Sequence, residues 1–265
     1  MIARARIAAQ PRNEANVAKP GSVAATLAIL RLLAKCDGPV GVNTIARELT
    51  LAPSSCFKIL KQLQRADFVD FDERSKCYSL GVGAIELARR ALDPNKAFSI
   101  IRPRLDQVAD QFAVAIGFWR GISHSRIVLA GFVEGNSPMR IHMSVGQRLP
   151  MLMGAVGRAI AANLGLGEME LRREFGRLRW QSQPKFEDYV AQVEEARRRG
   201  FAVDRDNFAT GVTTVAVAIH DSVGAVSYGL SGIMFSGQCD EESIVRVGEA
   251  LVDVAAWAAS RLTAG

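Results

Sequence analysis

Apolar residues recur at helical spacing in three segments near the start of the chain, and they alternate with polar residues in two shorter segments that follow. Ser22 can cap the first helix, Asp37-Gly38-Pro39 can end it, and Pro53 suits the first turn of the third. We therefore predict helices at residues 22–34, 42–49 and 53–65, and strands at residues 68–71 and 77–80. This order of elements predicts a winged helix-turn-helix.

The third predicted helix has one apolar face and one basic face. At about 100° per residue, Cys56, Leu60 and Leu63 share one sector with Ile59, and the opposite sector carries hydroxyls and cations but no acid. Short polar groups can reach base edges in the major groove while cations neutralise phosphates. We therefore predict that DNA is contacted by this helix and by the tip of the hairpin, through Ser54, Ser55, Lys58, Lys61, Arg65, Arg74 and Lys76.

The rest of the chain predicts a second domain that mixes helices with strands. The predicted helices cover residues 82–92, 100–112, 154–164, 168–175, 186–199 and 241–262, and the predicted strands cover residues 114–120, 126–134, 139–145, 213–220 and 225–231. Hairpin-length turns link most of the strands, which favours a largely antiparallel sheet flanked by helices. The helix at 82–92 either connects the two domains or packs on the wing, and both interpretations stay open.

These patterns give an α+β chain with an N-terminal winged helix-turn-helix. Residues 1–20 show no periodicity and end in Lys19-Pro20-Gly21, so we expect a mobile arm. The expected parts are the arm at 1–20, the DNA-binding domain at 21–81, a linker helix at 82–96 and a second domain at 97–265.

The net charge of +6 belongs entirely to the first part of the chain. Residues 1–96 hold 15 Lys and Arg against 9 Asp and Glu, whereas residues 97–265 hold 18 of each kind. An excess of cations in one domain suits a polyanion, because each neutralised phosphate releases counterions. A solvated surface with a basic tail would give the same excess, so the charge alone leaves both interpretations open.

Several classes of protein are disfavoured by composition. No apolar run reaches the roughly 18 residues that span a bilayer, and no apolar stretch follows the early arginines as in a signal peptide, so we expect a cytoplasmic protein without membrane contact. The four cysteines are scattered, which favours buried or half-buried thiols over disulfides or a zinc site.

No motif for catalysis, cofactor binding or metal binding is found. The histidines at 124, 142 and 220 each stand alone, and the chain has no G-x-S-x-G elbow or Walker loop. Asp204-Arg205-Asp206 is a suggestive polar cluster, although a solvated turn between strands would look the same. We expect no cofactor, no metal and no enzymatic activity.

Segments in order along the chain resemble the IclR family of bacterial regulators. They are IARELTLAPSSCFKILKQLQRADFV followed by a wing ending in YSLG, then LPMLMGAVGRAIAANL, RRRGFAVDRDNFATGVTTVAVAIHD and YGLSG. The resemblance implies that the C-terminal domain is GAF-like and binds a small organic acid or aromatic compound. It also implies dimers that associate through the DNA-binding domains.

The resemblance also implies where an effector would bind. The start of the GAVGRA helix, at Ala155 and Val156, would receive an anionic group, and Met151 and Met153 replace the family's histidine-containing approach. The pocket is then less polar than is usual for the family, unless the methionines belong to the core, so an aromatic or longer-chain acid is expected. The expected effector-binding residues are Ile141, Met151, Met153, Ala155, Val156, Asp204, Thr214, Gly229 and Ser231.

The sequence thus predicts a transcriptional regulator of a catabolic operon that binds double-stranded operator DNA under the control of an organic-acid effector. Because one winged helix reads only a half-site, we expect a homodimer or a dimer of dimers. One alternative is a constitutive DNA-binding regulator whose C-terminal domain only oligomerises. The other is an enzyme with a borrowed domain, which would require a nucleophile or an acid–base pair.

Overall fold

A computed structural model of the protein describes residues 21–93, 96–123, 125–136, 141–220 and 224–262. The chain divides into two compact units, residues 1–88 and 89–265, and the boundary falls within one helix. The expected arm at 1–20 lies outside the described residues. Each unit has a core of its own.

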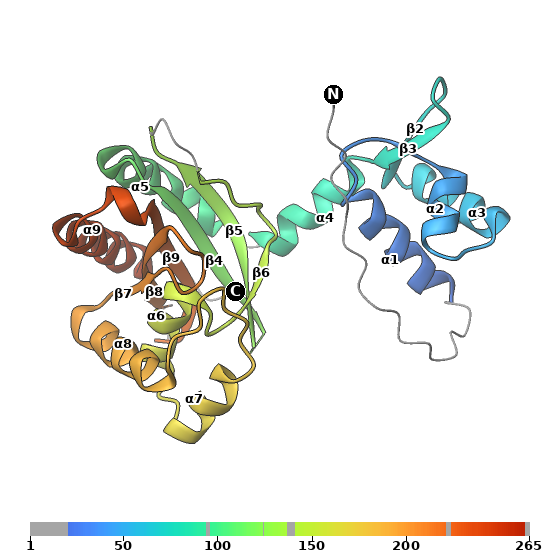
Figure 1. Ribbon diagram of the computed structural model, residues 1–265. Coiled ribbons are helices and arrows are strands. Elements are labelled where there is room, and N and C mark those ends of the chain that lie inside the picture. Colours follow the sequence, from blue (N-terminus) through green and yellow to red (C-terminus); the bar gives the residue numbers. More distant parts are fainter. Residues whose placement is uncertain (1–20, 94–95, 124, 137–140, 221–223, 263–265) are drawn as a thin grey trace, which may run out of the picture. The chain divides into compact units, whose positions relative to one another are not determined.

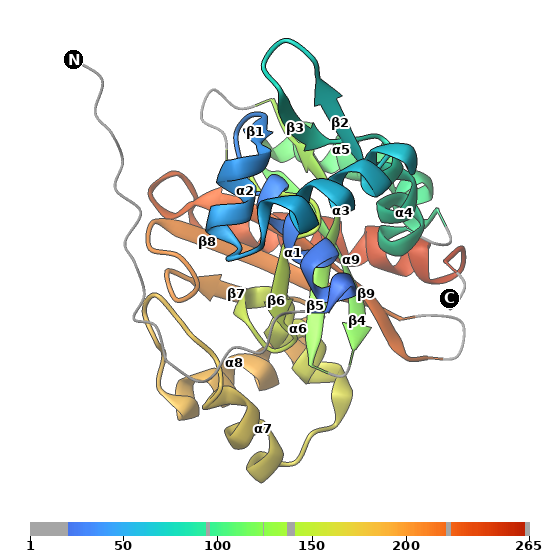
Figure 2. The same cartoon turned by 90° about the vertical axis from the view of Figure 1, so that its right-hand side faces the viewer.

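The N-terminal unit contains a helix-turn-helix beside a small antiparallel sheet (Figures 1 and 2). Its helices are α1 (Ser22–Leu33), α2 (Val42–Glu48), α3 (Pro53–Arg65) and the first part of α4 (Gly83–Leu92), and its strands are β1 (Val40–Gly41), β2 (Val69–Asp72) and β3 (Cys77–Leu80). Ile29, Ile45 and Leu60 are fully buried where the first three helices meet. The predicted winged helix-turn-helix is confirmed.

Two local details of this unit differ from the sequence-based expectation. Gly21 rather than Ser22 precedes the first turn of α1, and no side chain caps that turn. The two-residue strand β1 was not predicted, because it is too short to show an alternating pattern and exists only through its pairing with β3.

The C-terminal unit is built on a six-stranded sheet in the order β6-β5-β4-β9-β8-β7, with every neighbouring pair antiparallel. The strands are β4 (Ala115–Ser123), β5 (Arg126–Glu134), β6 (Arg148–Pro150), β7 (Ala202–Arg205), β8 (Val212–His220) and β9 (Val226–Phe235). The helices are α5 (Ala97–Phe112), α6 (Gly154–Leu164), α7 (Glu168–Phe175), α8 (Phe186–Arg199) and α9 (Glu241–Ala259), with a 3₁₀ turn, η1, at Ser236–Gln238. The predicted antiparallel sheet with flanking helices is confirmed.

The helices cover both faces of this sheet (Figure 1). α5 and α9 pack on one face, and α6 and α8 pack on the other. Successive side chains of a strand point to opposite faces. On β9, Leu230 therefore packs in the core under α5 and α9, and Ser231 lies on the second face, which α6 and α8 cover. The second face, under α6, carries a cavity.

The expected strand at 139–145 is wrong in its described part, since residues 141–145 have no regular structure and β6 pairs with β5 instead. β7 was missed because its acidic and basic residues suggested a turn. In the structure Asp204 lies within β7, opposite Thr214 of β8, and the turn begins at Asp206, which has a φ of 59°.

Gly157 allows the first turn of α6 to lie directly on the preceding loop. A Cβ atom at this position would be 2.0 Å from the carbonyl carbon of Leu152. We predict that Gly157→Ala destabilises the C-terminal unit by at least about 1–3 kcal/mol. Gly237→Ala, where a Cβ would meet nothing within 4 Å, should change stability by less than about 0.5 kcal/mol.

Urea unfolding followed by tryptophan fluorescence measures this difference, because all three tryptophans belong to the C-terminal unit. Equal stability of the two variants would show that the backbone contact at Gly157 is not a constraint.

Candidate functional site

The exposed face of α3 is basic and carries hydroxyl groups at its start. Ser54, Ser55, Lys58 and Arg65 are exposed, whereas Cys56, Leu60 and Leu63 are buried against the unit's core. No acidic residue lies in the first turn, so the partial positive charge of the helix N-terminus is not neutralised there. This face suits a polyanion.

Lys61 differs from the other predicted DNA-contacting cations, because it is half-buried and partnered. Its ammonium donates a hydrogen bond to Gln64 Oε1 at 3.1 Å. It also lies 5.7 Å from the ring centroid of Phe57 and 5.2 Å from that of Phe71 on β2. Lys61 therefore links α3 to the wing, and it would have to give up contacts to reach a phosphate.

The tip of the wing is held by an acid and presents cations outward. Asp72 accepts hydrogen bonds from Ser75 Oγ at 2.7 Å and from the Arg74 amide at 2.9 Å. These bonds, led by the one from Ser75, hold the pKa of Asp72 below its ordinary value, so the carboxylate stays charged and the turn stays closed. Arg74 and Lys76 are both exposed beside it.

A cavity of about 250 Å³ lies between the start of α6 and the sheet. Its wall is mostly apolar. It is formed by residues of the start of α6, β4, β8, β9, the 141–149 segment and the loop after β7. Six of the nine predicted effector positions line it, namely Ile141, Met153, Ala155, Val156, Thr214 and Ser231.

The start of α6 opens into this cavity with unpaired amides. Gly157 donates to the Met153 carbonyl at 2.9 Å, whereas the amides of Ala155 and Val156 have no acceptor among the described residues. No side chain caps the helix, no acid lies in its first turn, and both residues are buried. Buried amides need a partner, so the cavity offers donors and the positive end of a helix dipole to an anion.

The opposite wall of the cavity holds one oriented hydroxyl group. The indole N–H of Trp119 on β4 donates to Ser231 Oγ at 2.8 Å, and both side chains are buried. Because Ser231 accepts this bond and donates to no atom of the described residues, its hydroxyl hydrogen is available to a ligand in the cavity.

Three predicted positions lie off the wall of this cavity. Met151 and Gly229 line a separate, open groove of about 680 Å³. A Cβ at Gly229 would be 3.0 Å from Cγ1 of Val156, so Val156 lies between that backbone and the cavity. Asp204 is 1% exposed and belongs to an ion pair behind the wall.

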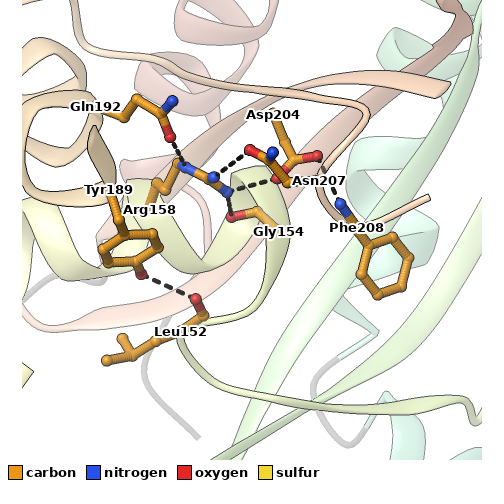
Figure 3. Close-up of polar contacts among 8 residues, drawn as sticks. All are labelled: Leu152, Gly154, Arg158, Tyr189, Gln192, Asp204, Asn207 and Phe208. Carbon is orange, nitrogen blue, oxygen red and sulfur yellow. Dashed lines mark hydrogen bonds and ion pairs between the residues drawn. The ribbon is translucent and has the colours of Figure 1, made fainter. Parts of the chain in front are cut away.

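That ion pair joins α6 to β7 (Figure 3). Arg158 is fully buried, and its Nη1 donates to Asp204 Oδ2 at 2.6 Å and to the Gly154 carbonyl at 2.9 Å. The other oxygen of Asp204 accepts the amide of Phe208 at 3.0 Å. Since Gly154 and Phe208 both line the cavity, the ion pair positions two sides of its wall.

Two further donors of Arg158 are also satisfied. Nε donates to Gln192 of α8 at 2.7 Å and Nη2 donates to Asn207 at 2.9 Å. The Tyr189 ring lies 5.0 Å from the guanidinium carbon, and its hydroxyl donates to the Leu152 carbonyl at 2.9 Å. Burial raises the pKa of Tyr189 well above its ordinary value, so the phenol remains a donor.

Two family models match this sequence. The IclR helix-turn-helix domain matches residues 22–73, and the bacterial transcriptional regulator IclR C-terminal model matches residues 90–260, which is more than half of the chain. The chain belongs to the IclR family of bacterial transcriptional regulators.

The repressor AllR from Escherichia coli K12 is 28% identical over 235 residues, which cover 86% of this chain and 85% of AllR. The crystal structure of an IclR transcriptional regulator from Alicyclobacillus acidocaldarius has a TM-score of 0.75 and 29% identity, over 92% of this chain and 99% of that one. An IclR homolog from Microbacterium hydrocarbonoxydans, solved with 4-hydroxybenzoate, shares the fold with a TM-score of 0.74 and 15% identity, over 91% and 98% of the two chains. Relatives named as repressors agree with the expectation that this regulator is not an enzyme.

Sequence reasoning missed several residues that shape the cavity of this IclR-family regulator. Arg158 lies inside the quoted GAVGRA motif but was not singled out, and Trp119 and Phe208 supply the aromatic part of the wall. The alternation of side chains along β4 could have indicated which face of the sheet Trp119 occupies. Trp119 pairs with Gly229 on β9 and donates a hydrogen bond to Ser231. Phe208 carried no pattern of its own.

Two kinds of site are absent from the described part of this regulator. No group of three or more His, Cys, Asp or Glu side chains there could hold a metal ion. No helix of the described residues is long and apolar enough to cross a membrane.

The contacts of the two α3 lysines predict different effects on DNA binding. Lys58→Ala should reduce the slope of log affinity against log salt by about 0.9, as expected for one lost phosphate contact. Lys61→Ala should change that slope less, because its ammonium is partnered within the protein. Titrations between about 50 and 200 mM salt measure both slopes; an unchanged slope for Lys58→Ala would mean that this face of α3 does not meet phosphates.

The buried ion pair predicts a strong asymmetry between single and double variants. Asp204→Asn leaves the fully buried Arg158 without its counter-charge and should cost about 3–5 kcal/mol of unfolding free energy. The double variant Arg158→Met/Asp204→Leu removes both charges. Its loss of unfolding free energy should be clearly less than the summed losses of the single variants Arg158→Met and Asp204→Leu. Additive losses in urea unfolding would show that the two side chains are not energetically coupled.

Proposed function

We propose that this regulator binds an operator through residues 21–81 and senses an aromatic or otherwise apolar carboxylate through residues 97–265, in the cytoplasm where bacterial DNA lies. The observation that carries the proposal is the buried start of α6, whose unpaired amides face an otherwise apolar cavity. An effector acts by favouring one arrangement of the DNA-reading heads over another.

The chemistry of the cavity favours one class of acid. The carboxylate takes the amides of Ala155 and Val156, and the Ser231 hydroxyl donates to it or to a ring substituent. Most of the wall, including Met153, Val156 and Phe208, offers no side-chain hydrogen bonds, and the other polar side chains that line it are His142, Gln147 and Thr214. Each hydroxyl of a sugar acid that reaches none of these groups would be left unpaired at a cost of about 1–3 kcal/mol.

The size of the cavity fits one ring. A closed apolar cavity of about 150 Å³ is enough to bind benzene, and this cavity measures about 250 Å³. A benzoate-type acid therefore fits, and 4-hydroxybenzoate, the ligand in the Microbacterium hydrocarbonoxydans homolog, belongs in the test panel.

Thermal-shift and operator-binding titrations with benzoates, aliphatic dicarboxylates and sugar acids test the effector class. We expect an apolar or aromatic monocarboxylate to raise the melting temperature and to change operator affinity. Thr214→Leu, which adds volume at the wall, should abolish this response, whereas the near-isosteric Thr214→Val should keep it.

Two outcomes would contradict the assignment. A full response in the folded Thr214→Leu variant would place the effector elsewhere, and a preference for small polyhydroxylated acids would contradict the apolar wall. If no metabolite changed either quantity, the alternative would hold that the C-terminal unit only oligomerises.

We further propose that the regulator is a dimer, or a dimer of dimers, joined in part by α1 and α4. These two helices expose large apolar side chains, at Val23 and Leu27 on α1 and at Ile85 and Leu87 on α4. Monomeric proteins seldom leave such groups in water when they gather in patches.

Light scattering tests this assembly. Leu27→Glu combined with Ile85→Glu should shift the protein toward monomers and weaken operator binding, because each head reads one half-site. Met169→Glu, at a residue 89% exposed on α7, is the matched control and should change neither property. A monomeric wild-type protein at micromolar concentration with operator present would remove the proposal.

A further inference from the structure

Phe57 stands out on the face of α3 that is proposed to meet DNA. It is 46% exposed, and no other Phe, Tyr or Trp of the described residues is as exposed. It follows Cys56, whose side chain is buried, and precedes the exposed Lys58. Because this helix is proposed to meet DNA, the exposed ring is available to an apolar group in the major groove.

The ring of Phe57 is anchored on one side by a cation. The Lys61 ammonium lies 5.7 Å from its centroid and 5.2 Å from that of Phe71, so the cation joins the two rings. The Lys76 ammonium of the wing lies 5.8 Å from the centroid of the Phe71 ring, so Phe71 contacts a second cation. The contact with Lys61 limits the movement of the Phe57 ring and leaves the ring exposed.

The neighbours of Phe57 indicate what the ring would touch. Ser54, three residues before it, and Lys61, four residues after it, lie on the same side of α3 as the ring. The exposed hydroxyl of Ser54 can bond to polar groups of DNA. The apolar group that the major groove presents is the C5-methyl of thymine, and phenylalanine is among the side chains that contact it.

We propose that Phe57 is a specificity-determining residue that recognises a thymine methyl group in each operator half-site. The inference rests on the proposed DNA contact by α3 and adds which base chemistry one side chain selects. It assigns to Lys61 the positioning of the ring, which agrees with the internal contacts of its ammonium.

Replacement of thymine by deoxyuridine tests the contact, because this change removes only the methyl group. A duplex is first selected from random sequences with the wild-type protein, and each thymine is then replaced in turn. At one position per half-site, replacement by deoxyuridine should lower the affinity of the wild-type protein about fourfold, because one methyl group fewer is buried in the complex. Phe57→Ala should lower affinity for the thymine duplex by at least as much and should no longer distinguish the two bases at that position.

Two control variants make the result specific. Lys58→Ala should weaken binding to both duplexes equally and keep the discrimination, whereas Phe57→Leu should keep part of it. Circular dichroism and melting temperature should match the wild type for Phe57→Ala, since the ring is outside the core.

The inference is overturned if the wild type tolerates uracil at every position, or if Phe57→Ala keeps the wild-type discrimination. Equal weakening of all duplexes by Phe57→Ala would assign the ring to backbone or protein contacts and would also overturn it. Failure of the wild type to select any duplex would instead contradict the proposed DNA-binding function itself.

Discussion

The C-terminal unit depends on one buried ion pair, between Arg158 and Asp204. Arg158 makes three hydrogen bonds that tie α6 to α8, β7 and the following loop, and a fourth to the Gly154 carbonyl of α6 itself. Asp204 holds the amide of Phe208. Neither charge could remain buried without the other. The pair occupies polar groups behind the wall, whereas the amides of Ala155 and Val156 and the hydroxyl of Ser231 have no acceptor among the described residues. We propose that an effector's carboxylate satisfies the two amides.

The two units divide the physical work of the protein. The N-terminal unit, residues 1–88, holds most of the net positive charge, with 12 Lys and Arg against 8 Asp and Glu, and it presents hydroxyls, cations and one ring on α3 and the wing. The C-terminal unit is close to neutral and presents a small apolar cavity. In the function that we propose, attraction to DNA and selection of an organic acid therefore rest on different interactions, and the effector would act without touching the DNA-binding surface.

Local pattern was enough to predict most helices but not the inner contacts of the cavity. The bounds predicted for α6, α7 and α8 are those observed, because α7 and α8 are amphipathic and because Gly165 and Gly200 end α6 and α8 in the left-handed conformation. β7 and the role of Arg158 depend on pairing with distant segments. The contact between Trp119 and Ser231 spans 112 positions, and no short-range pattern reports it. The family resemblance supplied six positions that line the cavity, whereas Asp204, Met151 and Gly229, which it also indicated, lie off its wall.

The most direct test of this account is a crystal structure of the full chain with 4-bromobenzoate, located by the anomalous signal of bromine. We predict a carboxylate oxygen at about 2.7–3.1 Å from the amide nitrogens of Ala155 and Val156, with the ring against Met153 and Phe208 and the ion pair of Arg158 unchanged. Bromine in the groove lined by Met151 and Gly229, with the cavity at α6 empty, would contradict the central claim.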